Sequence, residues 1–198
     1  YVVVTMDVER PTSFTRPEAT GPKNWEDSEQ YILGYVDRAA EFGFPVTLFI
    51  HPEAAVQHVQ LFEDLKGRGC CVEGLHIHPW KLGDGKYKAH FGGLSDRDMR
   101  ACLSEAIGVW QSGTGRRPIY FRPGTFSAND YMYQALADLG FRGGSCSIPG
   151  RTWPRMNVNW IGAEPDPHRA HSTFRPIAGS LPFANMPVSV DFSERIVS

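Results

Sequence analysis

Short strand-like stretches recur along the chain, and several of them are continuous apolar runs rather than alternating ones. They lie at residues 2–7, 46–50, 71–78, 119–122 and 141–147. Uninterrupted apolar runs are typical of strands that are covered on both faces, as in parallel sheets flanked by helices. The first run, which contains Val2–Val4, is therefore predicted to be a buried strand.

Segments with apolar residues at helical spacing separate these strands. Asp27 with Gln30 is predicted to begin the first helix, which Gly43 ends. Ser95 and Ser127 are each followed three residues later by an aspartate, a pattern that predicts a helix start. Four helices are predicted, within residues 27–42, 55–66, 95–110 and 127–139. After Pro149 the pattern weakens, and only residues 187–191 look like a further strand.

Regular alternation of strands and helices predicts an α/β fold with a parallel sheet, either an open sheet or a barrel. Both arrangements place ligand sites at the carboxyl ends of the strands. With 198 residues, the chain is long enough for one substantial core and short for two. Residues 1–198 are therefore predicted to be a single catalytic domain, incomplete at one or both ends because both termini look cut.

Composition narrows the range of partners. The formal net charge is −2, without long runs of one sign, which argues against nucleic acid and favours a small molecule or a neutral polymer. No stretch is long or apolar enough to span a bilayer. The four cysteines do not form a disulfide framework and are predicted to be buried thiols, which favours a cytoplasmic location. The oligomeric state is left open.

Metal-binding residue types gather at the ends of two predicted strands. His76 and His78 end the third strand, and residues two apart on a strand point to the same face, so both imidazoles can reach one metal. Asp7 and Glu9, again two apart, follow the first strand and supply a hard oxygen ligand. The alternatives are two hydrogen-bonded strand histidines, and carboxylates that are solvated or cap the following loop.

A fifth candidate residue, an arginine, is predicted at the same end of the sheet. Arg122 closes the fourth strand, and its guanidinium can orient the Asp7 carboxylate or form a structural ion pair with another carboxylate. Burying an unpaired carboxylate at the rim of a core costs free energy unless a cation pairs with it. A metal or an arginine is therefore expected near Asp7.

In three segments the sequence resembles the polysaccharide deacetylases of the NodB-homology type, which are carbohydrate esterase family 4-like. These segments are Thr5–Glu9, Glu73–Trp80 and Phe121–Ser127. The resemblance implies a distorted (β/α) barrel and a metal-dependent hydrolase that removes N-acetyl or O-acetyl groups from a polysaccharide or sugar precursor, in cell-surface glycan biosynthesis. It implies one divalent metal, zinc first, with cobalt, nickel or manganese as alternatives.

The resemblance also implies roles for individual residues. Asp7 corresponds to the catalytic base, Arg122 to the arginine that orients it, and His76 and His78 to the metal-binding histidines. The chain departs from the family in two places, because Val8 replaces a second aspartate and the histidines are two rather than four residues apart. Glu9 is expected to replace the missing carboxylate ligand. If the backbone turns at Val8, Asp7 itself would bind the metal.

The family's late histidine, which protonates the departing amine, has no convincing counterpart here. His51, at the end of the second strand, is the candidate to replace it, ahead of His168 and His171 in the irregular later segment. Substrate contacts are expected from Trp80, Pro123 and Trp153, and Tyr120 is a further aromatic near the expected mouth. The aromatic side chains could equally be core.

Two other functions compete with the deacetylase. A catalytically silent homologue that binds carbohydrate is suggested by Val8 and by the missing late histidine. Two histidines and a carboxylate also make up the facial triad of non-haem iron enzymes, although the strand–helix alternation argues against the antiparallel folds that usually carry such sites.

Overall fold

The computed structural model describes residues 2–11, 21–191 and 193. It divides the chain into two compact units. The first unit comprises Tyr1–Ile77 with Glu105–Pro118, and the second comprises His78–Ser104 with Ile119–Ser198. Helix α4 (Asp96–Thr114) supplies residues to both. The single domain over residues 1–198 stays a prediction.

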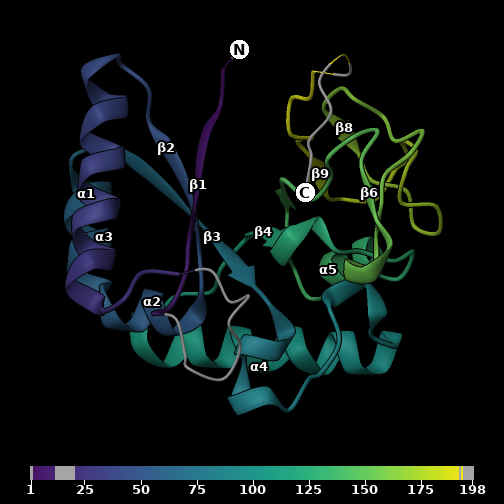
Figure 1. The fold of residues 1–198 in the computed structure, drawn as a ribbon, viewed down its shortest axis with the longest axis horizontal. Helices are drawn as coiled ribbons and strands as arrows, with labels where there is room; N and C mark the ends of the chain where they lie inside the picture. The colour runs from purple at the N-terminus through teal and green to yellow at the C-terminus, as the bar shows by residue number, and fades with distance from the viewer. Residues whose placement is uncertain (1, 12–20, 192, 194–198) are drawn as a thin grey trace. The chain divides into compact units, whose positions relative to one another are not determined.

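Three parallel strands form the sheet of the first unit, in the order β1-β2-β3. They are β1 (Val4–Val8), β2 (Val46–Ile50) and β3 (Cys71–Ile77). Their helices are α1 (Trp25–Glu41), α2 (Pro52–Gln57) and α3 (Val59–Gly67), and Figure 1 shows α1 and α3 beside the strands. Apolar side chains with at most 2% exposure fill the core between them: Ile32, Val36, Leu48, Ile50, Phe62, Leu65 and Leu75.

The second unit has shorter strands, in the order β4-β5-β9-β8. Pairing is parallel from β4 to β5 and from β5 to β9, and antiparallel between β9 and β8. The strands are β4 (Tyr120–Pro123), β5 (Gly143–Gly144), β8 (His168–Arg169) and β9 (Ala184–Asn185), with a separate antiparallel pair β6 (Thr152–Trp153) and β7 (Val158–Asn159). Its remaining helix is α5 (Met132–Asp138). The mostly parallel α/β fold is confirmed; barrel closure stays a prediction.

Three short 3₁₀ turns lie in the connection between β3 and α4. They are η1 (Pro79–Lys81), η2 (Gly83–Gly85) and η3 (Phe91–Gly93), and further turns η4 (Gly124–Phe126) and η5 (Pro154–Met156) follow β4 and β6. Phe91 is fully buried and its ring lies 5.4 Å from that of Phe121, so this connection is anchored in the core of the second unit.

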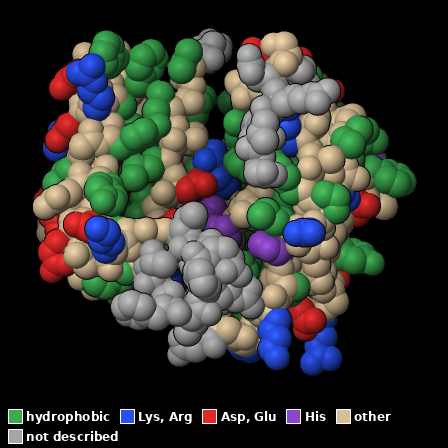
Figure 2. All heavy atoms as spheres, in the orientation of Figure 1, with side chains coloured by type: hydrophobic (Ala, Val, Ile, Leu, Met, Phe, Trp, Pro, Cys, Tyr) green, Lys and Arg blue, Asp and Glu red, His purple; other side chains and the backbone are tan. Residues whose placement is uncertain are grey.

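The prediction of a buried first strand is wrong at its beginning. Val2 and Val3 precede β1 and are 69% and 54% exposed, and Asp7 within β1 is exposed. β1 stands at one end of the strand order, and an apolar run does not by itself show whether a strand is covered on both faces. In Figure 2, hydrophobic side chains gather on the surface of the first unit. The exposed apolar residues of this unit include Tyr31, Tyr35, Phe42 and Phe44.

Three helix boundaries differ from the predictions. Helix α1 begins at Trp25 because the Asn24 side chain caps it, accepting a hydrogen bond of 2.7 Å from the Asp27 backbone N–H. The second predicted helix is divided into α2 and α3 at His58, whose backbone leaves the helical region. Ser127 does not begin α5, because its hydroxyl accepts a hydrogen bond from the Gly92 N–H instead. Ser95 does cap the Asp98 N–H, as predicted.

Two strand predictions fail in the second unit. β5 keeps only Gly143–Gly144 of the predicted stretch at 141–147, and residues 187–191 are not a strand. Within the described residues, the last strand is β9, a few residues earlier. Among the helices of the described residues, none is long and apolar enough to cross a membrane.

Candidate metal centre

The register of the first unit brings Glu9 and His76 to one edge of the sheet. Val8 on β1 pairs with Ile50 on β2, which pairs with Leu75 on β3. All three of these side chains are at most 2% exposed and form one buried row. Continuing the row by one residue reaches Glu9, His51 and His76, which by alternation belong to the opposite face at the carboxyl ends of the strands.

Glu9 and His76 are in direct contact. Glu9 Oε1 lies 3.2 Å from His76 Nε2, and the two side chains are 11% and 1% exposed. The sequence left open whether the backbone turns at Val8. Strand β1 runs through Val8, and the Glu9 carboxylate reaches the histidine.

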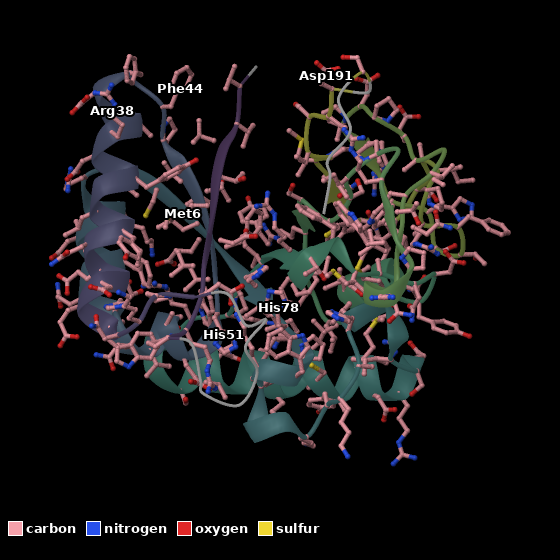
Figure 3. All side chains as sticks on the ribbon, in the orientation of Figure 1. Met6, Arg38, Phe44, His51, His78 and Asp191 are labelled. Atoms are coloured by element: carbon pink, nitrogen blue, oxygen red, sulfur yellow. The ribbon has the colours of Figure 1, made fainter. Side chains whose placement is uncertain are left out.

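His78 joins this pair because strand geometry continues past the end of β3. Its backbone is extended, with φ −100° and ψ 114°, so its imidazole returns to the face of His76 two residues earlier. Figure 3 labels His78 just beyond the arrowhead of β3. Donor atoms of Glu9, His76 and His78 all lie within 4.8 Å of one another. These are the three metal ligands predicted from the sequence, and in the described part of the chain they form a group that could hold a metal ion.

The donor set fits a divalent transition metal. Two imidazole nitrogens and one carboxylate oxygen are the protein ligands of many catalytic zinc sites, which keep the remaining position open. Two ligands at about 2.1 Å from a tetrahedral ion lie about 3.4 Å apart, close to the separation of Glu9 Oε1 and His76 Nε2. That pair alone would also suit an ion pair with a protonated imidazole. The third donor, His78, favours the metal.

Asp7 and Arg122, the predicted base and its orienting partner, lie in different units. Asp7 is exposed on β1 and does not belong to the three-residue group. Arg122 is 4% exposed on β4; its Nε donates a hydrogen bond of 3.2 Å to the Ser145 carbonyl, and its guanidinium lies 5.4 Å from the Phe126 ring centroid. The orienting contact between Asp7 and Arg122 stays a prediction.

His51, the predicted general acid, has a structural task in the first unit. It caps α2, where its Nδ1 accepts a hydrogen bond of 3.4 Å from the Glu53 N–H, and it is fully buried. Figure 3 shows its side chain at the beginning of α2. The catalytic role of His51 stays a prediction.

The predicted substrate-binding residues all fall in the second unit. Trp80 is partly exposed in η1, and its ring centroid lies 5.2 Å from that of His78. Pro123 is buried at the end of β4. Trp153 and Tyr120 are partly exposed on β6 and β4. Only Trp80 is thereby shown next to a member of the metal group, and the substrate contacts stay predictions.

His168 and His171 both contact backbone groups that are close to them in the sequence. His168 Nδ1 lies 2.7 Å from the Asp166 carbonyl. His171 Nδ1 accepts hydrogen bonds from the N–H groups of Thr173 and Phe174, at 3.0 and 3.1 Å. These contacts give both rings a role in shaping the segment between β7 and β9.

All four cysteines are free thiols, as predicted, and Cys71, Cys102 and Cys146 are buried. The prediction of burial is wrong for Cys70, which is only partly buried at the end of the turn before β3. Burial raises the pKa of the Cys71 thiol to about 11, and it also raises the pKa of Cys146, which is fully buried. A thiol becomes a nucleophile only as the thiolate. These two cysteines are therefore unsuited to nucleophilic catalysis at neutral pH.

The structure also reveals residues near the site that the sequence did not single out. A Cβ atom on Gly124 would lie 2.4 Å from His78 Nδ1, so the backbone of the turn after β4 lies directly against the imidazole. The Trp160 indole N–H donates a hydrogen bond of 2.8 Å to the Phe126 carbonyl in the same turn. In the sequence, the glycine that directly follows Arg122 and Pro123 was the available signal of a close backbone approach. Nothing distinguished Trp160 from an ordinary aromatic residue of the core.

Comparison with known proteins shows the fold. The sequence matches no protein-family model and none of the curated proteins. Among solved structures, a protein of Mycobacterium smegmatis assigned as a polysaccharide deacetylase is similar over 94% of this chain, with a TM-score of 0.55 and 17% identity. One of Pseudomonas aeruginosa PAO1, assigned to the same class, is similar over 96%, with a TM-score of 0.53 and 14% identity.

An allantoinase, Puue, is similar to the same degree. It matches over 96% of this chain, with a TM-score of 0.55 and 14% identity. The chain spans 58%, 62% and 61% of the length of the Mycobacterium, Pseudomonas and allantoinase structures. At these identities the likeness is one of fold, and it confirms the NodB-like α/β class that the three sequence motifs predicted.

Proposed function

We propose that this protein is a metal-dependent hydrolase that removes N-acetyl or O-acetyl groups from a carbohydrate. The observation that carries the proposal is the Glu9, His76 and His78 group at the carboxyl ends of β1 and β3. Support comes from the fold, which is shared with two proteins assigned as polysaccharide deacetylases and with an allantoinase. In parallel α/β folds, ligands bind at this end of the strands.

Glu9, His76 and His78 would hold one divalent metal, zinc first, with cobalt, nickel or manganese as alternatives. Two nitrogen donors and a single carboxylate suit these ions better than magnesium or calcium, which prefer oxygen ligands. The chemistry that such an ion supplies when bound is activation of a water molecule and polarisation of the acetyl carbonyl.

The chain's own groups would move the protons. Asp7 is exposed on β1, two residues before Glu9, and is the proposed base that accepts a proton from the attacking water. Arg122 is proposed to orient it, as the arginine does in the family that the sequence resembles. An amine must be protonated as it departs, and His51 through Nε2 is the proposed donor. The alcohol that leaves from an O-acetyl ester requires this protonation less than an amine does.

Carbohydrate is the proposed substrate, within the biosynthesis of a cell-surface glycan. Trp80 and Trp153 are partly exposed and can stack against sugar rings. The net charge of −2 suits a neutral polymer better than a polyanion.

The proposal is tested by measuring acetate release from N-acetylated chito-oligosaccharides and O-acetylated xylo-oligosaccharides. We expect release that disappears after chelation, returns with zinc, and falls at least about 100-fold in Asp7→Asn, which removes the base. Asp37→Asn is the control, because Asp37 is half-exposed on α1 and pairs with Arg68. Zinc-independent release, or full activity of Asp7→Asn, would contradict the mechanism.

A catalytically silent carbohydrate-binding protein is the second candidate. The observation that favours this candidate is Val8. Its apolar side chain is 2% exposed, at the position where the resembled motif has a second aspartate. Binding of either oligosaccharide by calorimetry without acetate release would support this candidate. A non-haem iron enzyme is the third, and iron rather than zinc in protein purified without chelators would favour it.

A further inference from the structure

The turn that follows β4 contains two consecutive residues in a backbone conformation that side chains disfavour. Thr125 has φ 55° and Phe126 has φ 56°. A non-glycine residue in this left-handed region is strained and persists only where its surroundings hold it there. Such strain is common at sites that require fixed geometry.

Several hydrogen bonds hold this turn. The Trp160 indole N–H donates to the Phe126 carbonyl at 2.8 Å, and Trp160 itself is fully buried. The Thr125 hydroxyl donates to the Gly124 carbonyl at 2.7 Å, and the Ser127 N–H donates to the same carbonyl at 3.1 Å. Trp160 is the partner that comes from outside the turn, from the residue directly after β7.

Both ends of the turn touch a residue of the candidate site. At one end, a Cβ added to Gly124 would lie 2.4–2.6 Å from three atoms of the His78 ring, so backbone packs against the imidazole and limits its rotation. At the other end, the Phe126 ring lies 5.4 Å from the centre of the Arg122 guanidinium, within the range of a cation–π contact.

We propose that the Gly124–Phe126 turn, held by Trp160, is a positioning element that fixes the His78 imidazole for metal binding and steadies the Arg122 guanidinium. Trp160 acts through the turn and is a positioning residue rather than a catalytic one. Groups that orient a metal ligand in this way commonly change metal affinity when they are removed. This inference rests on the proposed function, because it assigns His78 to a metal.

The first test is Trp160→Phe, which removes the indole N–H and keeps an aromatic ring. Zinc affinity is measured by competition with a chromophoric chelator, and the visible spectrum of the cobalt-loaded protein reports the geometry of the site. We expect zinc affinity about 10-fold weaker than wild type and a shifted cobalt spectrum. Trp110→Phe, at an equally buried tryptophan of α4, is expected to leave both unchanged.

A rescue variant separates local positioning from general loss of structure. Glycine adopts positive φ at little cost, so Thr125→Gly in the Trp160→Phe background should hold the turn with less help. We expect it to restore a part of the lost zinc affinity. Wild-type affinity in Trp160→Phe, or a loss that Thr125→Gly does not reduce, would overturn the proposal.

Gly124→Ala provides an independent test if Trp160→Phe does not fold. The new methyl group would meet the His78 ring, so zinc affinity should fall at least about 10-fold. Gly108→Ala is the control, because a Cβ at that position in α4 has open space around it. Unchanged affinity in folded Gly124→Ala would contradict the proposal. Failure of the wild-type protein to bind zinc would instead contradict the proposed function itself.

Discussion

The strands of the two units are held together by different means. In the first unit, strands of five, five and seven residues pair in continuous register, and amphipathic helices bury apolar side chains beside them. In the second, β4 has four residues, and β5, β8 and β9 have two each. Backbone pairing and apolar packing can hold the strands of the first unit together, whereas the shorter strands of the second unit need additional support.

Side chains that bond to the backbone provide that support. Asn185 on β9 accepts a hydrogen bond from the Cys146 N–H at 3.0 Å and donates one to the Ser147 hydroxyl at 2.8 Å, in a fully buried position. Asn129 donates to the carbonyls of Gly92 and Leu94, at 3.1 and 2.9 Å. These side chains fix irregular segments of the second unit through individual hydrogen bonds.

Truncating the apolar core of the first unit should have the largest effect. Leu48 is fully buried at the centre of β2, so Leu48→Ala is expected to lower the free energy of unfolding by about 2–5 kcal/mol. Urea unfolding followed by circular dichroism measures this. Val72→Ala on β3, where the side chain is 46% exposed, should cost much less. Equal costs for the two variants would contradict the role assigned to packing.

Removing a buried polar side chain from the second unit should lower the free energy of unfolding less than Leu48→Ala does. The loss should still be far larger than when an exposed polar side chain is removed. Asn185→Ala leaves the Cys146 N–H and the Ser147 hydroxyl without this partner, and we expect a loss of about 1–3 kcal/mol in the free energy of unfolding. Asn159→Ala, at an exposed position of β7, is the matched control. If both variants unfold at the same urea concentration, Asn185 does not support the second sheet.

The cap of α1 tests local order in the first unit. Asn24→Ala removes the side-chain acceptor of the Asp27 N–H and should lower the free energy of unfolding by about 1 kcal/mol. Asn24→Asp keeps an acceptor and should retain most of the stability. An alanine variant as stable as wild type in thermal unfolding would show that packing alone fixes the start of α1.

The smallest effect is a pH dependence in the first unit. Burial lowers the pKa of His58, partly opposed by Glu29, and the ring packs between Trp25 and Phe62. Because the unfolded chain binds this proton more tightly, stability is lost as the pH falls through the unfolded-state pKa of about 6.5. His58→Gln should lose less stability than wild type between pH values of about 7.5 and 5.5. Parallel stability curves for the two proteins would refute this assignment.

The candidate metal group could be predicted because its geometry follows from strand periodicity. His76 and His78 share a face two residues apart, and Glu9 follows a strand whose register leads to His76. The strand–helix order of the first unit was equally readable, although Asn24 rather than Asp27 begins α1. Both aspartate and asparagine suit such a boundary, so residue type alone placed it three residues late.

The second unit was less predictable, for a physical reason. Two-residue strands such as β5 and β9 are too short to carry a periodic pattern. Positive φ at Thr125 and Phe126 contradicts the preference of both residue types. These features depend on distant partners such as Trp160 and Asn185, and no local signal in a single sequence identifies those pairs.

The proposed function depends on metal binding by Glu9, His76 and His78, and the metal content of the purified protein measures this binding. Protein purified without chelators is analysed by plasma mass spectrometry and compared with the His76→Ala, His78→Ala double variant and with a His168→Ala, His171→Ala control from the second unit. We expect one metal per chain in wild type and control, with zinc before other ions, and loss of the metal from the His76 and His78 variant. Equal metal content in all three proteins, or none even after reconstitution with zinc, would contradict metal binding by these residues.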